Sequence, residues 1–314
     1  MLKPFRRWFH QAHWGCRKLD NKRAEQYNNS LREYYAIQLI GGTEMDIQTL
    51  ESYARQVRRD IIIMTAAAGA GHPGGSLSST EAMVALYFDV MNIDPKDDKN
   101  PDRDRFVLSK GHSAPALYGT LCERGFFGRE EFDHFRQLHG ILQGHPDTKK
   151  CPGVDASTGS LGQGISIAVG MALGAKHTGN KCHVYTIIGD GESQEGLVWE
   201  ASMAAAHYKL DNLTVILDHN GLQIDGTNDE VMSLGDIKAK ALAFGYDVIE
   251  VQDGNDMKQV VEALHVPACP GKPRYIILNT LKGKGVSFME GQVGWHGKAP
   301  NAEQAAQALK ELEG

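Results

Sequence analysis

The sequence lacks a long apolar segment, a regular cysteine pattern and a strong excess of one charge sign. No apolar run approaches the roughly 20 residues that span a bilayer, which excludes a transmembrane helix. The five cysteines show no CxxC or metal-ligand spacing, which favours reduced thiols in a cytoplasmic protein over a disulfide framework. A net charge of −6 argues against a general nucleic-acid or membrane surface. We therefore expect a soluble cytoplasmic protein that binds neither nucleic acid nor membranes.

The first 44 residues differ from the remainder, because acidic side chains are missing before Asp20. Residues 1–23 carry seven basic residues and one acid, and no apolar run follows that would make them a secretory signal. A targeting segment is one interpretation. A non-native or upstream-translated extension is another, since Met45 directly precedes a regular helical pattern. We expect 1–44 to be a poorly ordered accessory extension and 45–314 to form the functional domain.

Hydrophobic periodicity from residue 46 onward predicts short buried strands that alternate with helices. Strands are expected at 106–108, 183–188, 213–217, 246–251 and 275–279. Helices are expected at 47–68, 78–90, 114–122, 129–138, 165–175, 195–208, 237–244, 257–264 and 302–312. The glycine-rich stretch 71–76 has no apolar period and is expected to be a loop. The predicted fold class is therefore α/β, with a three-layer doubly wound parallel sheet.

Two polar turns in the stretch 183–222 each follow an expected strand. A right-handed crossover places both turns on one edge of a parallel sheet, where open α/β sheets bind ligands. Asp190 supplies a carboxylate from the first turn, while the Asn220 amide and the Leu222 carbonyl supply oxygens from the second. Mg²⁺ takes part of its ligands from such protein oxygens and the rest from phosphates and water. The pattern fits a magnesium diphosphate, and on these residues alone a tight turn with an exposed Asn220 is the alternative.

Four histidines lie beside glycine in the loops or at strand ends, namely His72, His112, His145 and His296. A single histidine in such a place is more often a structural hydrogen-bonding group than a functional one. Four in the same context, in a fold whose ligands bind at loop edges, favour a site. They lack zinc spacing and accompanying cysteines, so we interpret them as hydrogen-bonding and proton-transfer groups.

Taken in order, these loops resemble those of one known family. The matching segments are GHPGGS (71–76), DRDRFVLSKGH (102–112), GHP (144–146), STGSLGQG (157–164), GDGESQEG (189–196), DHNGLQIDG (218–226) and WHG (295–297). Together they resemble the diphosphate-binding half of transketolase, a thiamine-diphosphate enzyme. The segments TGSLGQG and WHG favour transketolase over deoxyxylulose-phosphate synthase and the dehydrogenase first components, which share the fold.

The resemblance implies how the cofactors, thiamine diphosphate and Mg²⁺, are held. It assigns Mg²⁺ to Asp190, Asn220 and the Leu222 carbonyl. The residues implied to contact the diphosphate or the cofactor rings are His112, Gly159, Leu161, Gly191 and His296.

The resemblance also implies catalytic residues. His72, His145 and His296 are expected to meet substrate hydroxyls and to move protons. Glu195, with Glu200, matches glutamates that link two cofactor sites across the dimer interface of the family. For Glu200, a solvated position on a helix is the alternative.

The chain ends at Gly314, about where the second domain of the family would begin. In the family that domain supplies the glutamate that activates the cofactor, the pyrimidine pocket and the arginines that hold the sugar phosphate. The loop GHPGGSLSST also differs from the GHPGAPLG of single-chain transketolases. Both features resemble the N-terminal subunit of a split transketolase. A partner subunit with the pyrimidine-binding domain, and a dimeric or two-plus-two assembly, are therefore expected.

The function implied is transfer of a two-carbon ketol unit from a ketose phosphate to an aldose phosphate, as in the pentose phosphate pathway. Alternatives with the same cofactor are deoxyxylulose-phosphate synthesis and transfer from a sulfosugar or a branched pentose. A non-catalytic scaffold subunit is disfavoured, because it would not need Asp190, Asn220 and the loop histidines. Lys282 and Lys284 are expected in a solvated loop, with contact to a phosphate as the alternative.

Overall fold

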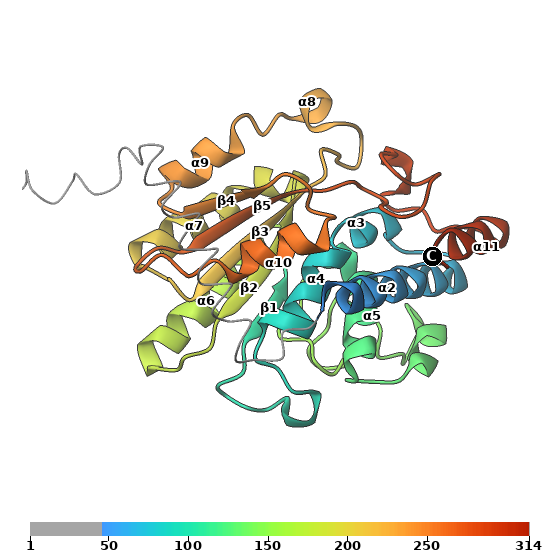
Figure 1. The fold of residues 1–314 in the computed structure, drawn as a ribbon, viewed down its shortest axis with the longest axis horizontal. Helices are drawn as coiled ribbons and strands as arrows, with labels where there is room; N and C mark the ends of the chain where they lie inside the picture. Colours follow the sequence, from blue (N-terminus) through green and yellow to red (C-terminus); the bar gives the residue numbers. More distant parts are fainter. Residues whose placement is uncertain (1–45, 314) are drawn as a thin grey trace, which may run out of the picture. The chain divides into compact units, whose positions relative to one another are not determined.

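The computed structural model describes residues 46–313, so the extension expected at 1–44 lies outside the described residues. Within that range the strands are β1 (Arg105–Leu108), β2 (Val184–Gly189), β3 (Leu213–His219), β4 (Asp247–Val251) and β5 (Arg274–Asn279). They form one parallel sheet in the order β1-β2-β3-β5-β4 (Figure 1). Each strand lies where the pattern of apolar residues predicts one, and the predicted parallel sheet is confirmed.

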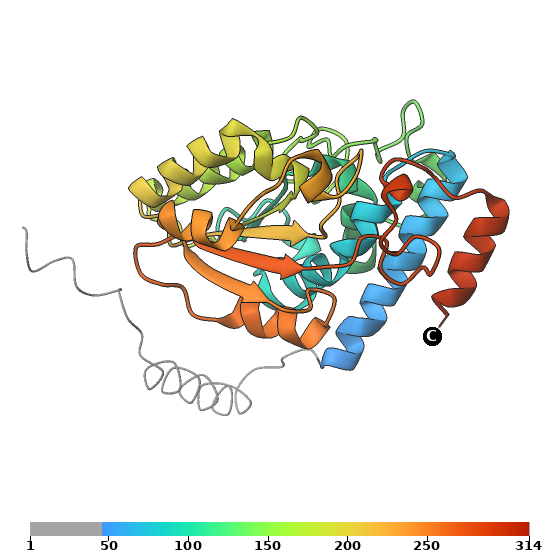
Figure 2. The same ribbon diagram turned by 90° about the horizontal axis from the view of Figure 1, so that it is seen from above.

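Helices cover both faces of this sheet (Figure 2). Helices α6 (Gln163–Thr178), α7 (Gly196–His207) and α9 (Ile237–Ala243) pack on one face, and α10 (Met257–His265) packs on the other. The reason is the direction of the connections: the chain moves one way across the sheet from β2 to β3 to β4, and returns from β4 to β5. Right-handed crossovers in opposite directions put their helices on opposite faces. The doubly wound, three-layer architecture is therefore confirmed.

The remaining elements surround the α10 face and the loops. The helices are α2 (Ile47–Ala68), α3 (Pro73–Ser78), α4 (Thr80–Ala85) with a π-helical turn (Leu86–Val90), α5 (Ala114–Arg124), α8 (Asn228–Val231) and α11 (Ala302–Glu311), which packs against α2. Turns of 3₁₀ helix lie at Pro95–Asp97, Gly111–Ser113, Arg129–His134, Gly191–Gln194 and Val293–Trp295. Among residues 46–313 we find no helix with the length and apolarity needed to cross a membrane.

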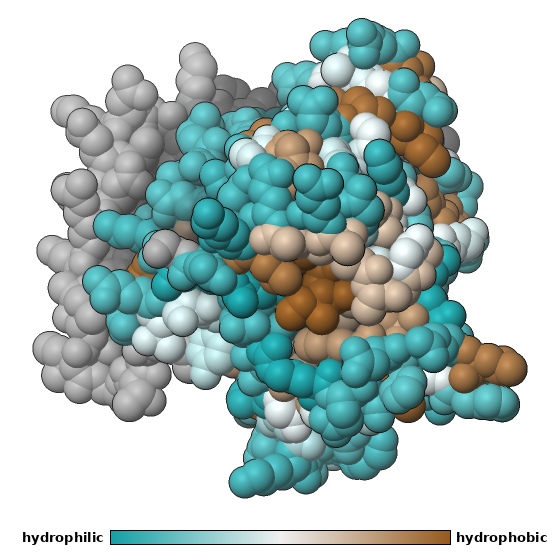
Figure 3. Space-filling view, turned by 90° about the vertical axis from the view of Figure 1, so that its right-hand side faces the viewer, coloured by the Kyte–Doolittle hydropathy of each residue, from teal (hydrophilic) through white to brown (hydrophobic). Residues whose placement is uncertain are grey.

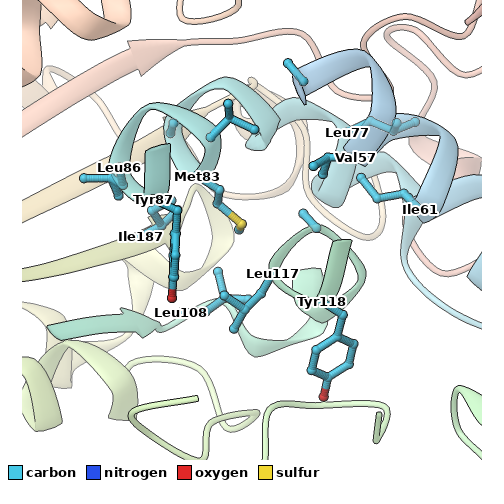
Figure 4. Packing of buried hydrophobic residues seen from close by; sticks show 14 of the residues in the cluster. Val57, Ile61, Leu77, Met83, Leu86, Tyr87, Leu108, Leu117, Tyr118 and Ile187 are labelled. Carbon is cyan, nitrogen blue, oxygen red and sulfur yellow. The ribbon is translucent and has the colours of Figure 1, made fainter. Parts of the chain in front are cut away.

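The core is divided by the sheet into two clusters, because successive side chains of a strand point to opposite faces. Along β5, Tyr275 and Ile277 join the cluster under α6, α7 and α9, while Ile276 joins the cluster under α2, α4 and α5. Figure 4 shows the second cluster, where Leu108 of β1 and Ile187 of β2 approach the helices. Both faces of the strands are apolar, as expected for a parallel sheet buried between helices.

The glycine-rich segment 71–76 is not wholly a loop, and that prediction was wrong for its second half. Helix α3 begins at Pro73, with His72 at the N-cap position. The glycines allow close packing here, since a Cβ on Gly74 would lie 2.8 Å from the Trp295 carbonyl oxygen. The helix thus holds His72 at a fixed place.

Two other predicted helices also differ from the observed elements. The helix expected at 78–90 is divided into the end of α3, helix α4 and the π-helical turn. The helix expected at 129–138 is only a 3₁₀ turn that ends at His134. Arg136 follows it with a left-handed backbone (φ 62°), which a continuing helix could not contain.

A buried ion pair joins the helices to the loop after β5. The Nη2 atom of Arg58 in α2 lies 2.6 and 2.7 Å from the two carboxylate oxygens of Glu81 in α4. Arg58 Nε donates to the Lys284 carbonyl oxygen at 3.1 Å. Asn255 donates to Glu81 at 2.8 Å and accepts from the Leu281 N–H at 2.8 Å. The pair therefore fixes the loop 281–285 against the helical layer.

We expect Glu81→Ala to lower the free energy of unfolding by about 3–5 kcal/mol, because it leaves Arg58 buried without its counter-charge. Urea unfolding followed by circular dichroism measures the change. Lys238→Ala is the control, since it removes a pair with Glu250 on the surface (side chains 50% and 32% exposed) and is expected to cost less than about 1 kcal/mol. Equal losses in the two variants would contradict the structural role of the buried pair.

Candidate functional site

A cavity of about 380 Å³ lies at the carboxyl ends of β1, β2, β3 and β5. Figure 3 views the molecule from the side at which the strands end and shows apolar surface among hydrophilic residues. Nine of the residues predicted to form the site line this cavity, namely His72, His112, Gly159, Leu161, Asp190, Gly191, Asn220, Leu222 and His296. Parallel strands explain this convergence, because the loops that follow them all lie at one edge of the sheet.

Asp190 follows β2 and carries an unsatisfied oxygen. Its Oδ2 accepts a hydrogen bond from the Gly221 N–H at 2.7 Å, while the buried Oδ1 has no hydrogen-bond partner. His219 Nε2 lies 3.8 Å from that Oδ1. Burial is the main reason why the pKa of Asp190 is raised to about 6. A buried acceptor without a partner costs free energy, which a hard cation at this position would recover.

Asn220 is oriented by its neighbours. Its Nδ2 donates to Asp218 Oδ2 at 2.9 Å, so the other side of the amide is the carbonyl oxygen, Oδ1. That oxygen also accepts from the Leu222 N–H at 3.2 Å. Among residues 46–313 there is no group of three or more His, Cys, Asp or Glu residues that could hold a metal ion. Any metal here would therefore depend on neutral oxygens beside Asp190, the donor set that Mg²⁺ accepts.

Two buried lysines add positive charge to the cavity. Lys110 and Lys282 are 1% and 2% exposed and both line it. Lys110 Nζ lies 2.5 Å from Asp218 Oδ2, whereas Lys282 Nζ lies 3.0 Å from the ring nitrogen His296 Nδ1. Within the described range, Lys282 makes no ion pair with a carboxylate. Burial, with the charge of Lys110, lowers the pKa of Lys282 to about 8.

Three histidine rings lie against these lysines. The ring centroids are 5.4 Å apart for His72 and His112, 5.5 Å for His72 and His296, and 5.1 Å for His112 and His296. Burial and then nearby positive charges lower the pKa of His72 to about 4 and that of His296 to about 3. The same two causes hold the pKa of His112 well below its ordinary value.

The ring nitrogens of His296 and His72 differ in their hydrogen bonding. Because an ammonium only donates, His296 Nδ1 accepts from Lys282, and the ring proton is assigned to Nε2. His72 Nδ1 is buried without a hydrogen-bond partner. The cavity thus combines two ammonium groups, neutral imidazoles and the unsatisfied oxygen of Asp190, an arrangement suited to an anion held together with a cation.

His145 and Glu195 lie outside this lining. The ring centroid of His145 is 6.5 Å from that of His72, and a Cβ on Gly159 would lie 3.2 Å from the His145 ring. Burial, followed by the charge of Arg136, lowers the His145 pKa. Glu195 is exposed at the N-cap of α7. A role for Glu195 across an interface stays a prediction.

The prediction that Lys282 lies in a solvated loop was wrong. The sequence pattern around Lys282 indicates only a glycine-rich loop. The Lys282 side chain is buried because α3 and the segment around Trp295 pack against it, which is a tertiary contact. Lys110 and Asp218 were also not identified as site residues. The rule that polar groups after parallel strands form the site could have found all three, since Lys110 follows β1, Asp218 lies near the end of β3 and Lys282 follows β5.

Glu192, which also lines the cavity, joins three of the loops. Its Oε1 accepts from Ser109 Oγ at 2.5 Å and from the Gly162 N–H at 2.9 Å. Its Oε2 accepts from the Gly189 N–H at 3.2 Å. Glu192 is 1% exposed, so these bonds lie inside the protein and fix the loops that carry Leu161 and Asp190.

Fold and cavity together are typical of an α/β domain that binds an anionic ligand at the carboxyl ends of its strands. Comparison with known proteins is more specific: residues 48–314 match the family model described as "Transketolase, thiamine diphosphate binding domain". The chain therefore belongs to the transketolase family. It is one of the subunits of a transketolase, and so a component of a transferase.

Two kinds of relatives are found. The chain is 44% identical over 269 residues to a protein of Phocaeicola vulgatus named as one subunit of an apulose-4-phosphate transketolase, covering 85% of this chain and 95% of the relative. It is 43% identical over 265 residues to "6-deoxy-6-sulfo-D-fructose transketolase subunit SqwG" of Clostridium sp., covering 84% and 96%. With human transketolase the identity is 38%, and the match covers 86% of this chain but 43% of the human protein.

Solved structures agree with this assignment. Transketolase from Leishmania mexicana superimposes with a TM-score of 0.81 at 32% identity, covering 84% of this chain and 41% of that one. The predicted thiamine-diphosphate-binding fold is therefore confirmed. The match covers 43% of human transketolase and 41% of the Leishmania enzyme, so it is confined to one part of these longer chains.

We expect Lys282→Met to raise the pKa of His296 above about 3, because it removes an ammonium that lies 3.0 Å from the ring. The pKa is expected to stay below the ordinary 6.5, since burial, the larger cause, remains. Nitrogen NMR of the labelled histidine rings as a function of pH measures the shift. Lys298→Met removes an exposed lysine near the same loop and serves as control. An unchanged His296 pKa in Lys282→Met would contradict the electrostatic assignment.

Proposed function

We propose that this chain is the diphosphate-binding subunit of a split transketolase, which works with a second subunit that carries the pyrimidine-binding domain. The observation that supports this most directly is the length of the relatives. Those named as subunits are matched over 95% and 96% of their own length, whereas human transketolase is matched over 43%. The proposed reaction moves a two-carbon ketol unit from a ketose phosphate to an aldose acceptor.

The cavity suits thiamine diphosphate with Mg²⁺, judged from the residues present. The unsatisfied Oδ1 of Asp190, the Asn220 amide oxygen and the Leu222 carbonyl would hold the metal. The Gly191 backbone and the Lys282 ammonium offer positive groups to a diphosphate. Gly159 and Leu161, on the opposite loop of the cavity, would lie along the rings of the cofactor. When bound, thiamine diphosphate supplies the electron sink for breaking the carbon–carbon bond of the sugar.

The histidines supply the remaining proton chemistry in this proposal. An uncharged imidazole at His72 can accept a hydrogen bond or a proton from a substrate hydroxyl at neutral pH. His296, whose Nδ1 already accepts from Lys282, would offer its Nε2–H as a donor. A bound diphosphate would offset the positive charges around them, which raises their pKa values toward the working pH. His112 would donate to the diphosphate, and His145, whose ring packs against Gly159, would meet the substrate.

A self-associated assembly is part of the same proposal. Ile167 on α6 and Met203 on α7 are apolar side chains that are 36% and 56% exposed. Glu195 and Glu200 are exposed on the α7 segment beside them. A second copy packed on α6 and α7 would cover the apolar side chains and bring the glutamates of two copies together, as a dimer or within a two-plus-two complex.

The donor sugar has two candidates. The pentose phosphate reaction uses xylulose 5-phosphate and ribose 5-phosphate. An unusual sugar, either a branched pentose phosphate or a sulfosugar, is the second candidate, because the relatives named above carry such sugars in their names. Deoxyxylulose-phosphate synthesis is a weaker candidate, since the named relatives are transketolases.

The reaction is tested by incubating the full chain with thiamine diphosphate, Mg²⁺ and a donor–acceptor pair, alone and mixed with a candidate second subunit. The donors are xylulose 5-phosphate, a branched ketose phosphate, 6-deoxy-6-sulfofructose and pyruvate. We expect two-carbon transfer only in the mixture, because the proposed site is completed by the partner. Turnover by the chain alone would contradict the split assignment. No transfer from any sugar donor, while the subunits form a complex, would support the scaffold alternative instead.

We expect Asp190→Ala to abolish Mg²⁺-dependent binding of thiamine diphosphate, because it removes the single carboxylate of the proposed metal site. Isothermal titration with the cofactor, with and without Mg²⁺, measures this in the assembled complex. Asp225→Ala is the matched control: it removes an exposed carboxylate from the loop after β3 and should leave affinity unchanged. Retained Mg²⁺-dependent affinity in Asp190→Ala would overturn the metal assignment.

A further inference from the structure

Asp218, the residue before the last of β3, is a buried carboxylate that accepts hydrogen bonds from four side chains. Its Oδ2 accepts from Ser78 Oγ at 2.7 Å, from Lys110 Nζ at 2.5 Å and from Asn220 Nδ2 at 2.9 Å. Its Oδ1 accepts from Thr280 Oγ1 at 2.5 Å. The residue is 2% exposed, so these bonds form in a medium where they are strong and costly to lose.

Each of the four donors lies on a different segment, and each segment carries a residue of the cavity. Ser78 ends helix α3, whose N-cap is His72. Lys110 precedes His112 by two residues in the loop after β1, and Thr280 precedes Lys282 by two residues in the loop after β5. The fourth donor is Asn220 itself. One carboxylate therefore links its own loop after β3 to helix α3 and to the loops after β1 and β5, which are far away in the sequence.

The charge of Asp218 argues against a role as a direct ligand of the anion. A carboxylate repels a diphosphate, and both of its oxygens are already engaged by side chains. The Lys110 ammonium lies 2.5 Å from Oδ2, and the Ser78 and Thr280 hydroxyls donate to the two oxygens, an environment that stabilises the charged carboxylate. The carboxylate compensates the charge of Lys110, whereas Lys282 contacts the His296 ring nitrogen.

We infer that Asp218 is a positioning residue: it turns the Asn220 amide so that Oδ1 faces the metal site, and holds Lys110 and the loop of Lys282 at the diphosphate. This inference rests on the proposed function, because the metal and the diphosphate belong to it. The side chain acts through its four partners. Hydrogen-bonding groups behind metal ligands act in this way in metalloproteins, where their loss weakens metal binding about 10–100-fold.

The test is Mn²⁺ binding to the full chain, mixed with its partner subunit, at saturating thiamine diphosphate, followed by electron paramagnetic resonance. We expect Asp218→Asn to weaken Mn²⁺ affinity about 10–100-fold and to change the fine structure of the bound-Mn²⁺ spectrum. An affinity and spectrum like those of the wild type would overturn the inference. Thermal unfolding of the variant without cofactor or metal shows whether weaker Mn²⁺ binding comes from misplaced metal ligands in a folded protein or from unfolding.

A second pair of variants tests the same idea without changing charge. Thr280→Val removes the donor to Asp218 Oδ1 and is expected to weaken Mn²⁺ affinity about threefold, the size of one lost hydrogen bond. Thr280→Ser keeps the hydroxyl and should restore binding. If Asp218→Asn does not fold, wild-type affinity in Thr280→Val overturns the inference. Absence of Mn²⁺ binding in the wild type would refute the proposed function itself, which distinguishes the two failures.

Discussion

The structure depends on the placement of two buried ammonium groups at one edge of a parallel sheet. Lys110 is compensated by Asp218, but Lys282 meets an imidazole nitrogen instead of a carboxylate. Burying a charge without its counter-charge is unfavourable, so a protein keeps such an arrangement when a ligand completes it. The low pKa values of His72 and His296 have the same origin, because burial and neighbouring positive charge both disfavour imidazolium. A diphosphate is the type of anion that would compensate this positive charge.

The positive cavity requires rigid support, and buried acids provide it. Glu192 holds the loops of Leu161 and Asp190 through backbone N–H groups. The Arg58–Glu81 pair fixes the loop after β5 from the helical side. The oxygens of these carboxylates are thus occupied by donors of the protein itself.

The apolar layers decide where this cavity lies. Both faces of the sheet are covered by helices, so the polar ends of the strands are left as the place where loops can meet a ligand. Helix α3 adds to this edge from outside the sheet, because its glycines pack closely on the segment around Trp295 and bring His72 over the ends of the strands.

The sequence by itself determined the sheet and most of the cavity lining, because local patterns encode both. Short continuous runs of apolar residues define the strands, and glycine-flanked polar residues such as Asp190 and His112 mark their ends. Tertiary structure alone decided the rest. Lys282 is buried because α3 packs on its loop, and Asp218 became central because three distant donors converge on it. Neither fact leaves a periodic signal, since burial and hydrogen-bond partners are set by contacts between segments remote in the chain.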